Sequence, residues 1–112
     1  MSAFETTGPA KTAKISLAAS GTIVAAVSSK KIRVLSYVLV AVTKTAVKFQ
    51  SHTTPTDLTG AMTLGTTGDS GGVSSGFNPA GHFETLVGEA LDLALGTSVQ
   101  VSGHLTYQEV KA

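Results

Sequence analysis

Ser70, His52 and Asp57 are the residues whose types could together carry covalent catalysis. A serine hydroxyl becomes a strong nucleophile when a histidine accepts its proton and a buried carboxylate orients the imidazole ring. Ser70 lies in the segment GDSGG, residues 68–72, and His52 and Asp57 precede it in the chain. The order histidine, aspartate, serine is therefore present, and a fold that gathered these side chains would build a hydrolase site.

The segment GDSGG resembles the nucleophile loop of trypsin-like serine proteases, but the chain departs from that family elsewhere. The family distributes its triad over two barrels and roughly twice this length of chain. No segment around His52 matches the family's histidine motif. Residues 65–81 consist largely of Gly, Ser and Thr, so a five-residue match arises there easily. We interpret GDSGG as part of a long loop and expect that the protein is not an enzyme.

The histidines and carboxylates form no recognisable metal or acid–base motif. His52, His82 and His104 stand at spacings that match no local zinc motif. Glu89 and Asp92 are the closest acidic pair, and solvated surface is their expected role. The chain has no cysteine, which excludes disulfides and thiolate metal sites. The glycine-rich loop also lacks the lysine of a phosphate-binding loop. We expect no metal, cofactor or small-molecule substrate.

Charge is distributed unevenly along a nearly neutral chain. The net charge of +1 attracts neither nucleic acid nor an anionic membrane, and we expect neither as a partner. Residues 1–56 carry seven basic side chains against one acidic, a net of +6, whereas residues 57–112 carry one basic against six acidic, a net of −5. The two halves therefore complement each other, either within one domain or between copies of the chain. The sequence leaves both arrangements open.

We expect no targeting or membrane segment in this sequence. Its first residues are polar and lack the basic-then-apolar order of a signal peptide. The longest uncharged apolar stretch, residues 34–43, spans ten residues, whereas a membrane-spanning helix needs about 20. We therefore interpret this stretch as a buried strand.

Residues 31–42 give the strongest signal for a strand. β-branched residues dominate this segment, and both of its faces are largely apolar. Such a strand is either central in a sandwich or covered on its second face by another subunit. The apolar residues of the first face are Ile32, Val34, Val38, Val40 and Val42, and those of the second are Leu35, Tyr37, Leu39 and Ala41.

The remaining pattern also favours strands. Residues 83–95 are ambiguous, because the same apolar residues fit a helical stripe and a strand, but Gly88 inside a helix would cost about 1 kcal/mol. We predict a turn or short helix after Asn78 and Pro79, then a strand near residues 90–95. The fold class predicted is all-β: a single antiparallel β-sandwich over residues 14–112, jelly-roll-like, preceded by a polar N-terminal arm over residues 1–13. Further strands are expected near residues 14–17, 22–27, 46–51, 58–64 and 99–108.

Several segments together resemble small virion structural proteins of tailed bacteriophages. These segments are KKIRVLSYVLVA, VKFQS, DLTGAMTL, GFNPAGHFET, GEALDLAL and VQVSGHLTY, and the likeness spans approximately residues 30–110, without the N-terminal arm and the loop GTTGDSGGVSSG. The resemblance implies a capsid decoration or cement protein that is made in the bacterial host cytoplasm and located on the capsid surface. It implies a homo-oligomer, with a trimer favoured, and the major capsid protein as partner. The alternative is a tail or fibre module that binds a receptor or glycan.

Under this hypothesis, interface residues come from two parts of the chain. The arm would dock onto the capsid, and the second apolar face of the strand at residues 31–42 would lie either in the sandwich core or between subunits. Lys30 and Arg33, with Lys31, form a small basic patch at the start of that strand. The interface candidates are Phe4, Lys11, Lys14, Lys30, Arg33, Leu35, Tyr37 and Leu39.

Overall fold

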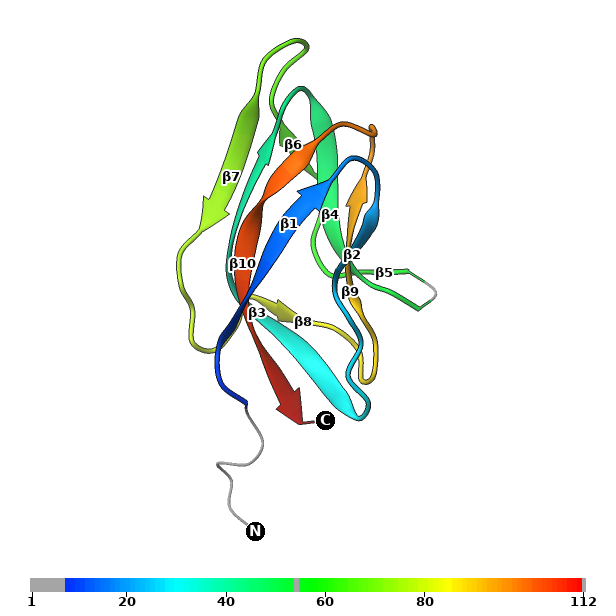
Figure 1. The fold of residues 1–112 in the computed structure, drawn as a ribbon, viewed down its shortest axis with the longest axis vertical. Coiled ribbons are helices and arrows are strands. Elements are labelled where there is room, and N and C mark those ends of the chain that lie inside the picture. Colours follow the sequence, from blue (N-terminus) through cyan, green and yellow to red (C-terminus); the bar gives the residue numbers. More distant parts are fainter. Residues whose placement is uncertain (1–7, 54, 112) are drawn as a thin grey trace.

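A computed structural model describes residues 8–53 and 55–111 as two packed antiparallel β-sheets (Figure 1). The described residues form ten strands and no helix. Sheet A contains β1 (Lys11–Leu17), β10 (Val101–Lys111), β3 (Lys30–Ala41), β7 (Gly71–Ser75) and β8 (Phe83–Glu84). Sheet B contains β2 (Gly21–Val24), β9 (Leu91–Leu95), β4 (Thr45–Ser51), β5 (Thr56–Asp57) and β6 (Met62–Leu64).

The order of the strands is that of a jelly roll. Sheet A runs β1-β10-β3-β7, and the short β8 pairs with β3. Sheet B runs β2-β9-β4-β5, and β6 also pairs with β4. The short strands β7 and β8 together occupy one position beside β3, and β5 and β6 together occupy one position beside β4. The ten strands therefore fill eight positions, four in each sheet. The predicted all-β antiparallel sandwich is confirmed. No helix of the described residues is long and apolar enough to cross a membrane.

The core lies between the two sheets and follows the alternation expected of half-buried strands. In β4, every second residue from Thr45 to Ser51 is buried. Phe49 at the centre of this strand is fully buried and packs edge-on against Tyr37, with 5.1 Å between ring centroids. Burying an aromatic or aliphatic side chain of this size contributes about 1.5–3 kcal/mol. Other fully buried members are Leu39, Leu91, Leu93, Val101 and Leu105.

A β-bulge in β3 explains why this strand is apolar on both faces in sequence. Thr106 of β10 lies opposite Ser36. The next residue of β10, Tyr107, lies opposite Val34, so Leu35 is an extra residue without a register partner. The bulge moves the inward positions from even numbers before it to odd numbers after it. The strand is therefore two half-strands, each with one face in the core, and the buried residues are Ile32, Val34, Leu39 and Ala41, together with Leu35 at the bulge.

The predicted boundary of the N-terminal arm is wrong at its C-terminal end. β1 begins at Lys11, which lies opposite Tyr107, and the Gly8 amide already donates a hydrogen bond of 2.9 Å to the Glu109 carbonyl. The start of β1 could not be predicted from the sequence, because β1 is an edge strand whose outward positions are exposed and polar. The rest of the arm, including Phe4, is in residues 1–7 and falls outside the described residues.

The predicted long loop at residues 65–81 is partly a strand. β7 pairs with β3 although it consists of Gly, Val and Ser, because contact with a long neighbour outweighs weak strand propensity. Residues 78–81 form the predicted turn, in which the Gly81 amide donates a hydrogen bond of 2.9 Å to the Asn78 carbonyl. The strand predicted near residues 90–95 is confirmed as β9, and residues 83–95 contain no helix.

Candidate functional site

The candidate catalytic residues lie apart in the fold. Ser70 ends the turn between β6 and β7, and β6 pairs with the first half of β4 through Thr45 and Leu64. His52 follows the other end of β4. Seven residues of strand separate these ends by roughly 20 Å. Ser70 and His52 therefore cannot exchange a proton, and the fold does not bring together the triad that the order of these residues in the sequence suggested.

Asp57 has a different partner from the one that the triad requires. Its carboxylate accepts hydrogen bonds from Gln50 at 2.8 Å and from Lys48 at 3.1 Å. The hydrogen bond from Gln50 and that from Lys48 lower the pKa of Asp57 below its usual value, because both stabilise the charged form. Asp57 thus holds β5 against β4 and has no contact with a nucleophile.

A polar cluster at the C-terminal end of β4 uses His52 and Asp92. The Nδ1 atom of His52 lies 2.6 Å from the Asp92 carboxylate, which also accepts a hydrogen bond of 2.7 Å from Thr22. The His52 side chain is 58% exposed and the Asp92 side chain is 19% exposed. Ser51, the residue before His52, donates a hydrogen bond of 2.5 Å to the Glu89 carboxylate. The hydroxyl proton of Ser51 is therefore not available to His52. The cluster joins β2, β4 and β9 without supplying a nucleophile.

The three histidines do not converge. His82 makes a 2.8 Å contact through Nε2 with the Gly76 carbonyl, and His104 is exposed on the outer face of sheet A. Within residues 8–53 and 55–111, no three His, Cys, Asp or Glu side chains are grouped to hold a metal ion.

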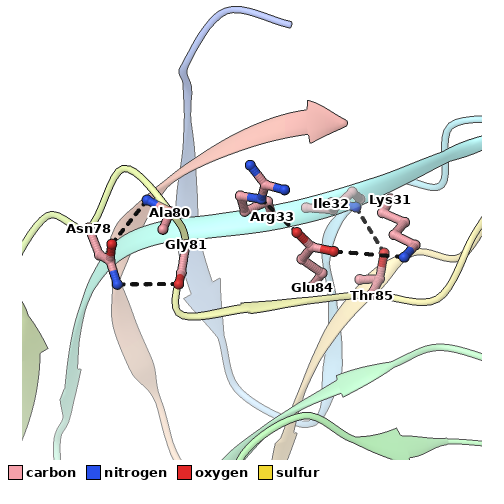
Figure 2. A network of polar contacts seen from close by, with 8 residues as sticks. All are labelled: Lys31, Ile32, Arg33, Asn78, Ala80, Gly81, Glu84 and Thr85. Carbon is pink, nitrogen blue, oxygen red and sulfur yellow. Dashed lines mark hydrogen bonds and ion pairs between the residues drawn. The ribbon is translucent and has the colours of Figure 1, made fainter. Parts of the chain in front are cut away.

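Two of the three basic residues at the start of β3, Lys31 and Arg33, pair with one carboxylate of the same chain (Figure 2). Arg33 donates through Nε to Glu84 at 2.6 Å, and Lys31 lies 3.8 Å from the other oxygen of that carboxylate. The Arg33 side chain also covers Gly81, where an added Cβ would overlap the arginine. The backbone at Gly81 has φ +88°, which favours glycine. Arg33 therefore fastens β8 and the 78–81 turn to β3, which is a role inside the subunit.

The apolar interface candidates of β3 lie inside the subunit. Leu35 and Leu39 are 1% and 0% exposed. Tyr37 is half-buried, and its ring packs against Phe49 and Phe83. Of the two positions that the sequence left open for this face, the structure shows the core for Leu35 and Leu39. The bulge and the opposing sheet B are the physical reason.

The exposed apolar surface of sheet A is on the opposite side of β3. Val40 is 46% exposed and Val42 is 55% exposed. Val40 lies between Ser102 of β10 and Gly72 of β7, so its neighbours are small and uncharged. Because Gly72 has no side chain, a shallow depression of about 240 Å³ lies beside Val38 and Val40. We call this surface the outer patch; it consists of Val38, Val40, Val42, Gly72, Ser102 and His104.

Sequence reasoning missed the outer patch because it treated β3 as a regular strand. The two apolar faces gave no reason to expect that Val38 and Val40 point away from the core and that Val40 is exposed. Side-chain size offered the one available signal: the larger Tyr37 and Leu39 face the core, and the smaller valines face outward.

Two further interface candidates remain on the surface. Lys14 is exposed and lies opposite His104, beside the outer patch, whereas Lys11 forms an ion pair of 3.1 Å with Glu109. Lys30 is half-buried at the first position of β3. Comparison of the chain with models of known protein families, with curated proteins and with solved structures finds no match.

Proposed function

We propose that the chain is a structural protein of a tailed-phage virion, a decoration subunit that oligomerises through the outer patch and strengthens contacts between major capsid proteins. The observation that carries the proposal is the outer patch itself. The solvent-facing side of an antiparallel sheet is normally polar. Here the centre of that side presents exposed valines among small neutral residues, which is the composition of a protein contact surface.

The size of the surface favours an oligomer that uses more than the sheet face. Four strands of about seven residues cover roughly 450 Å² in projection, whereas a stable interface needs about 800 Å² from each partner. The adjoining edge strand β7 supplies more, because it contains no charged residue or proline and pairs with β3 alone among the described strands. Phe77 follows β7 and is 65% exposed. The outer patch and this edge are two different surfaces, which is what a cyclic trimer requires of each subunit.

The oligomer is tested by light scattering after size-exclusion chromatography of the full chain. Wild type is expected as a trimer, and V40K is expected as a folded monomer, because the substitution places a charge in the outer patch. V87K is the matched control, since Val87 is 47% exposed in a loop and Val40 is 46% exposed; it is expected to remain a trimer. A monomeric wild type, or equal dissociation of both variants, would overturn the assembly role.

The location is tested on intact particles with an antibody raised against the chain. Gold label distributed over the whole head supports a decoration protein. Label confined to one vertex contradicts this role and supports the alternative, a tail or fibre module that binds a receptor or glycan.

A further inference from the structure

We propose that a hollow at one end of the sandwich is a binding site for a carboxylated sugar. The hollow has a volume of about 570 Å³. It lies where the β3–β4, β6–β7 and β9–β10 connections come together, at the top of Figure 1. Its lining contains Lys44 and Gly96, together with five threonines and Ala46; the threonines are Thr43, Thr45, Thr63, Thr67 and Thr97.

Two of the threonines hold the surrounding segments in fixed positions. Thr45 donates a hydrogen bond of 2.8 Å to the Thr97 carbonyl and accepts one of 3.1 Å from the Thr97 amide. Thr43 accepts a hydrogen bond of 3.0 Å from the Gly68 amide. The Gly96 amide adds a hydrogen bond of 2.7 Å to the Ala46 carbonyl. The three connections are therefore tied together before any ligand arrives, which reduces the entropy lost on binding.

The other side chains of the hollow retain their hydrogen-bonding capacity. The hydroxyls of Thr63, Thr67 and Thr97 and the ammonium of Lys44 make no side-chain hydrogen bond or ion pair within the described residues, and all four residues are exposed. Each hydroxyl donates one hydrogen bond and accepts two, and the ammonium donates three. Asp69, the carboxylate of the neighbouring turn, accepts a hydrogen bond of 3.3 Å from Thr66 and does not line the hollow.

This set of groups matches an anion that also carries hydroxyls. One unpaired lysine balances one carboxylate, whereas a phosphate dianion would call for further cationic donors. The three free threonine hydroxyls can both donate to and accept from the vicinal hydroxyls of a sugar ring. The lining has no aromatic side chain on which a ring could stack. We therefore expect weak binding, in the millimolar range, governed by the carboxylate and the hydroxyls together.

The test is a titration of ¹⁵N-labelled full chain with D-glucuronate at constant ionic strength. Glucuronate is expected to give saturable amide shifts at residues 43–46, 63–67 and 96–97, and D-glucose and acetate are expected to give much smaller ones. K44Q should weaken the affinity by at least about tenfold, because a charge-assisted hydrogen bond is lost. K111Q is the control, since Lys111 is an exposed cation at the opposite end of the sandwich, opposite Lys30; it should bind as wild type does. Dispersed amide resonances of each variant show that it is folded.

Three results would overturn the proposal: no saturable shift with glucuronate, equal shifts with acetate, or equal weakening by K44Q and K111Q. Each would reduce the hollow to a surface depression that attracts anions unspecifically or not at all. The readout is local to the hollow and does not depend on the oligomeric state, so its failure leaves the proposed assembly role untouched.

Discussion

Replacing Gly103 with alanine should destabilise the whole sandwich, because a Cβ added to this glycine would overlap the backbone of the neighbouring strand β3. Gly103 belongs to β10, between Ile15 of β1 and Leu39 of β3. Its φ of 153° is one that residues with a side chain rarely adopt. An added Cβ would overlap the carbonyl oxygen of Val38, and it would lie 3.3 Å from the Leu39 Cα. Both obstacles are backbone atoms, so no side-chain rotation relieves the overlap.

The expected cost follows from two terms. Holding alanine in a disfavoured backbone conformation costs about 1–3 kcal/mol. Displacing β3 to accommodate the extra methyl group costs a further 1–3 kcal/mol or so. The sum, about 2–6 kcal/mol, is a large part of the roughly 5–15 kcal/mol that stabilises a domain of this size. We therefore expect G103A to be marginally folded or unfolded at 25 °C.

The assay is urea denaturation followed by far-ultraviolet circular dichroism, with G60A as the control. An added Cβ at Gly60 meets no atom within 4 Å, so G60A should change the free energy of unfolding by less than about 1 kcal/mol, with stabilisation expected. If G103A lost less than about 1 kcal/mol relative to wild type, the backbone overlap inferred here would be refuted.

Three further predictions concern the sites considered above. Asp57 has a lowered pKa in the folded protein, so its contribution to stability is present above the unfolded pKa of about 4 and is lost as the pH falls through the folded pKa. The difference in urea midpoint between wild type and D57N should therefore shrink below about pH 4. A difference that does not change with pH would contradict this prediction. A fluorophosphonate probe should leave Ser70 unlabelled, because no histidine reaches it; labelling that is lost in S70A would restore the hydrolase hypothesis. Deleting residues 2–7 should leave the oligomer intact by light scattering and abolish binding to capsids; unchanged capsid binding in a sedimentation assay would exclude a docking role for this segment.

Most strands of the fold could be predicted, because apolar and polar residues alternate along their sequences. β4 and β10 alternate apolar and polar residues, and both were expected within a few positions. β7 could not be predicted, since Gly71, Gly72 and the serines carry no strand signal. Its pairing depends on β3, and at Gly72 any Cβ would overlap the Leu39 carbonyl. The need for glycine at position 72 comes from β3, a neighbouring strand that is distant in sequence. It therefore cannot be inferred from the composition of the β7 segment alone.

The candidate site was harder to predict because side-chain partners depend on register. His52 was compared with Asp57, five residues away, but its partner is Asp92, which β9 brings alongside β4. The outer patch was missed for a related reason. One bulge at Leu35 reverses which side of β3 faces the core, and no residue in the segment signals an extra position.

The division of charge between the two halves of the chain gains a physical meaning from the strand order. In the jelly roll, strands from the first half pair with strands from the second: β1 and β3 with β10, β3 with β7 and β8, β2 and β4 with β9, and β4 with β6. The short β5, which also pairs with β4, spans the midpoint and contributes Asp57 from the second half. Basic and acidic residues therefore face each other across neighbouring strands, as in the pairs Lys11–Glu109, Arg33–Glu84 and Lys48–Asp57.

Because these ion pairs are inside one subunit and partly exposed to solvent, each contributes little to the free energy of unfolding. Raising the salt concentration to about 1 M shortens the screening length to about 3 Å. This should lower the urea midpoint of each subunit slightly and leave the oligomer intact, because the outer patch that we assign to assembly contains no Asp, Glu, Lys or Arg side chain. Light scattering at low and high salt tests this expectation. Dissociation at high salt would place complementary charges between subunits and would contradict assembly through the outer patch.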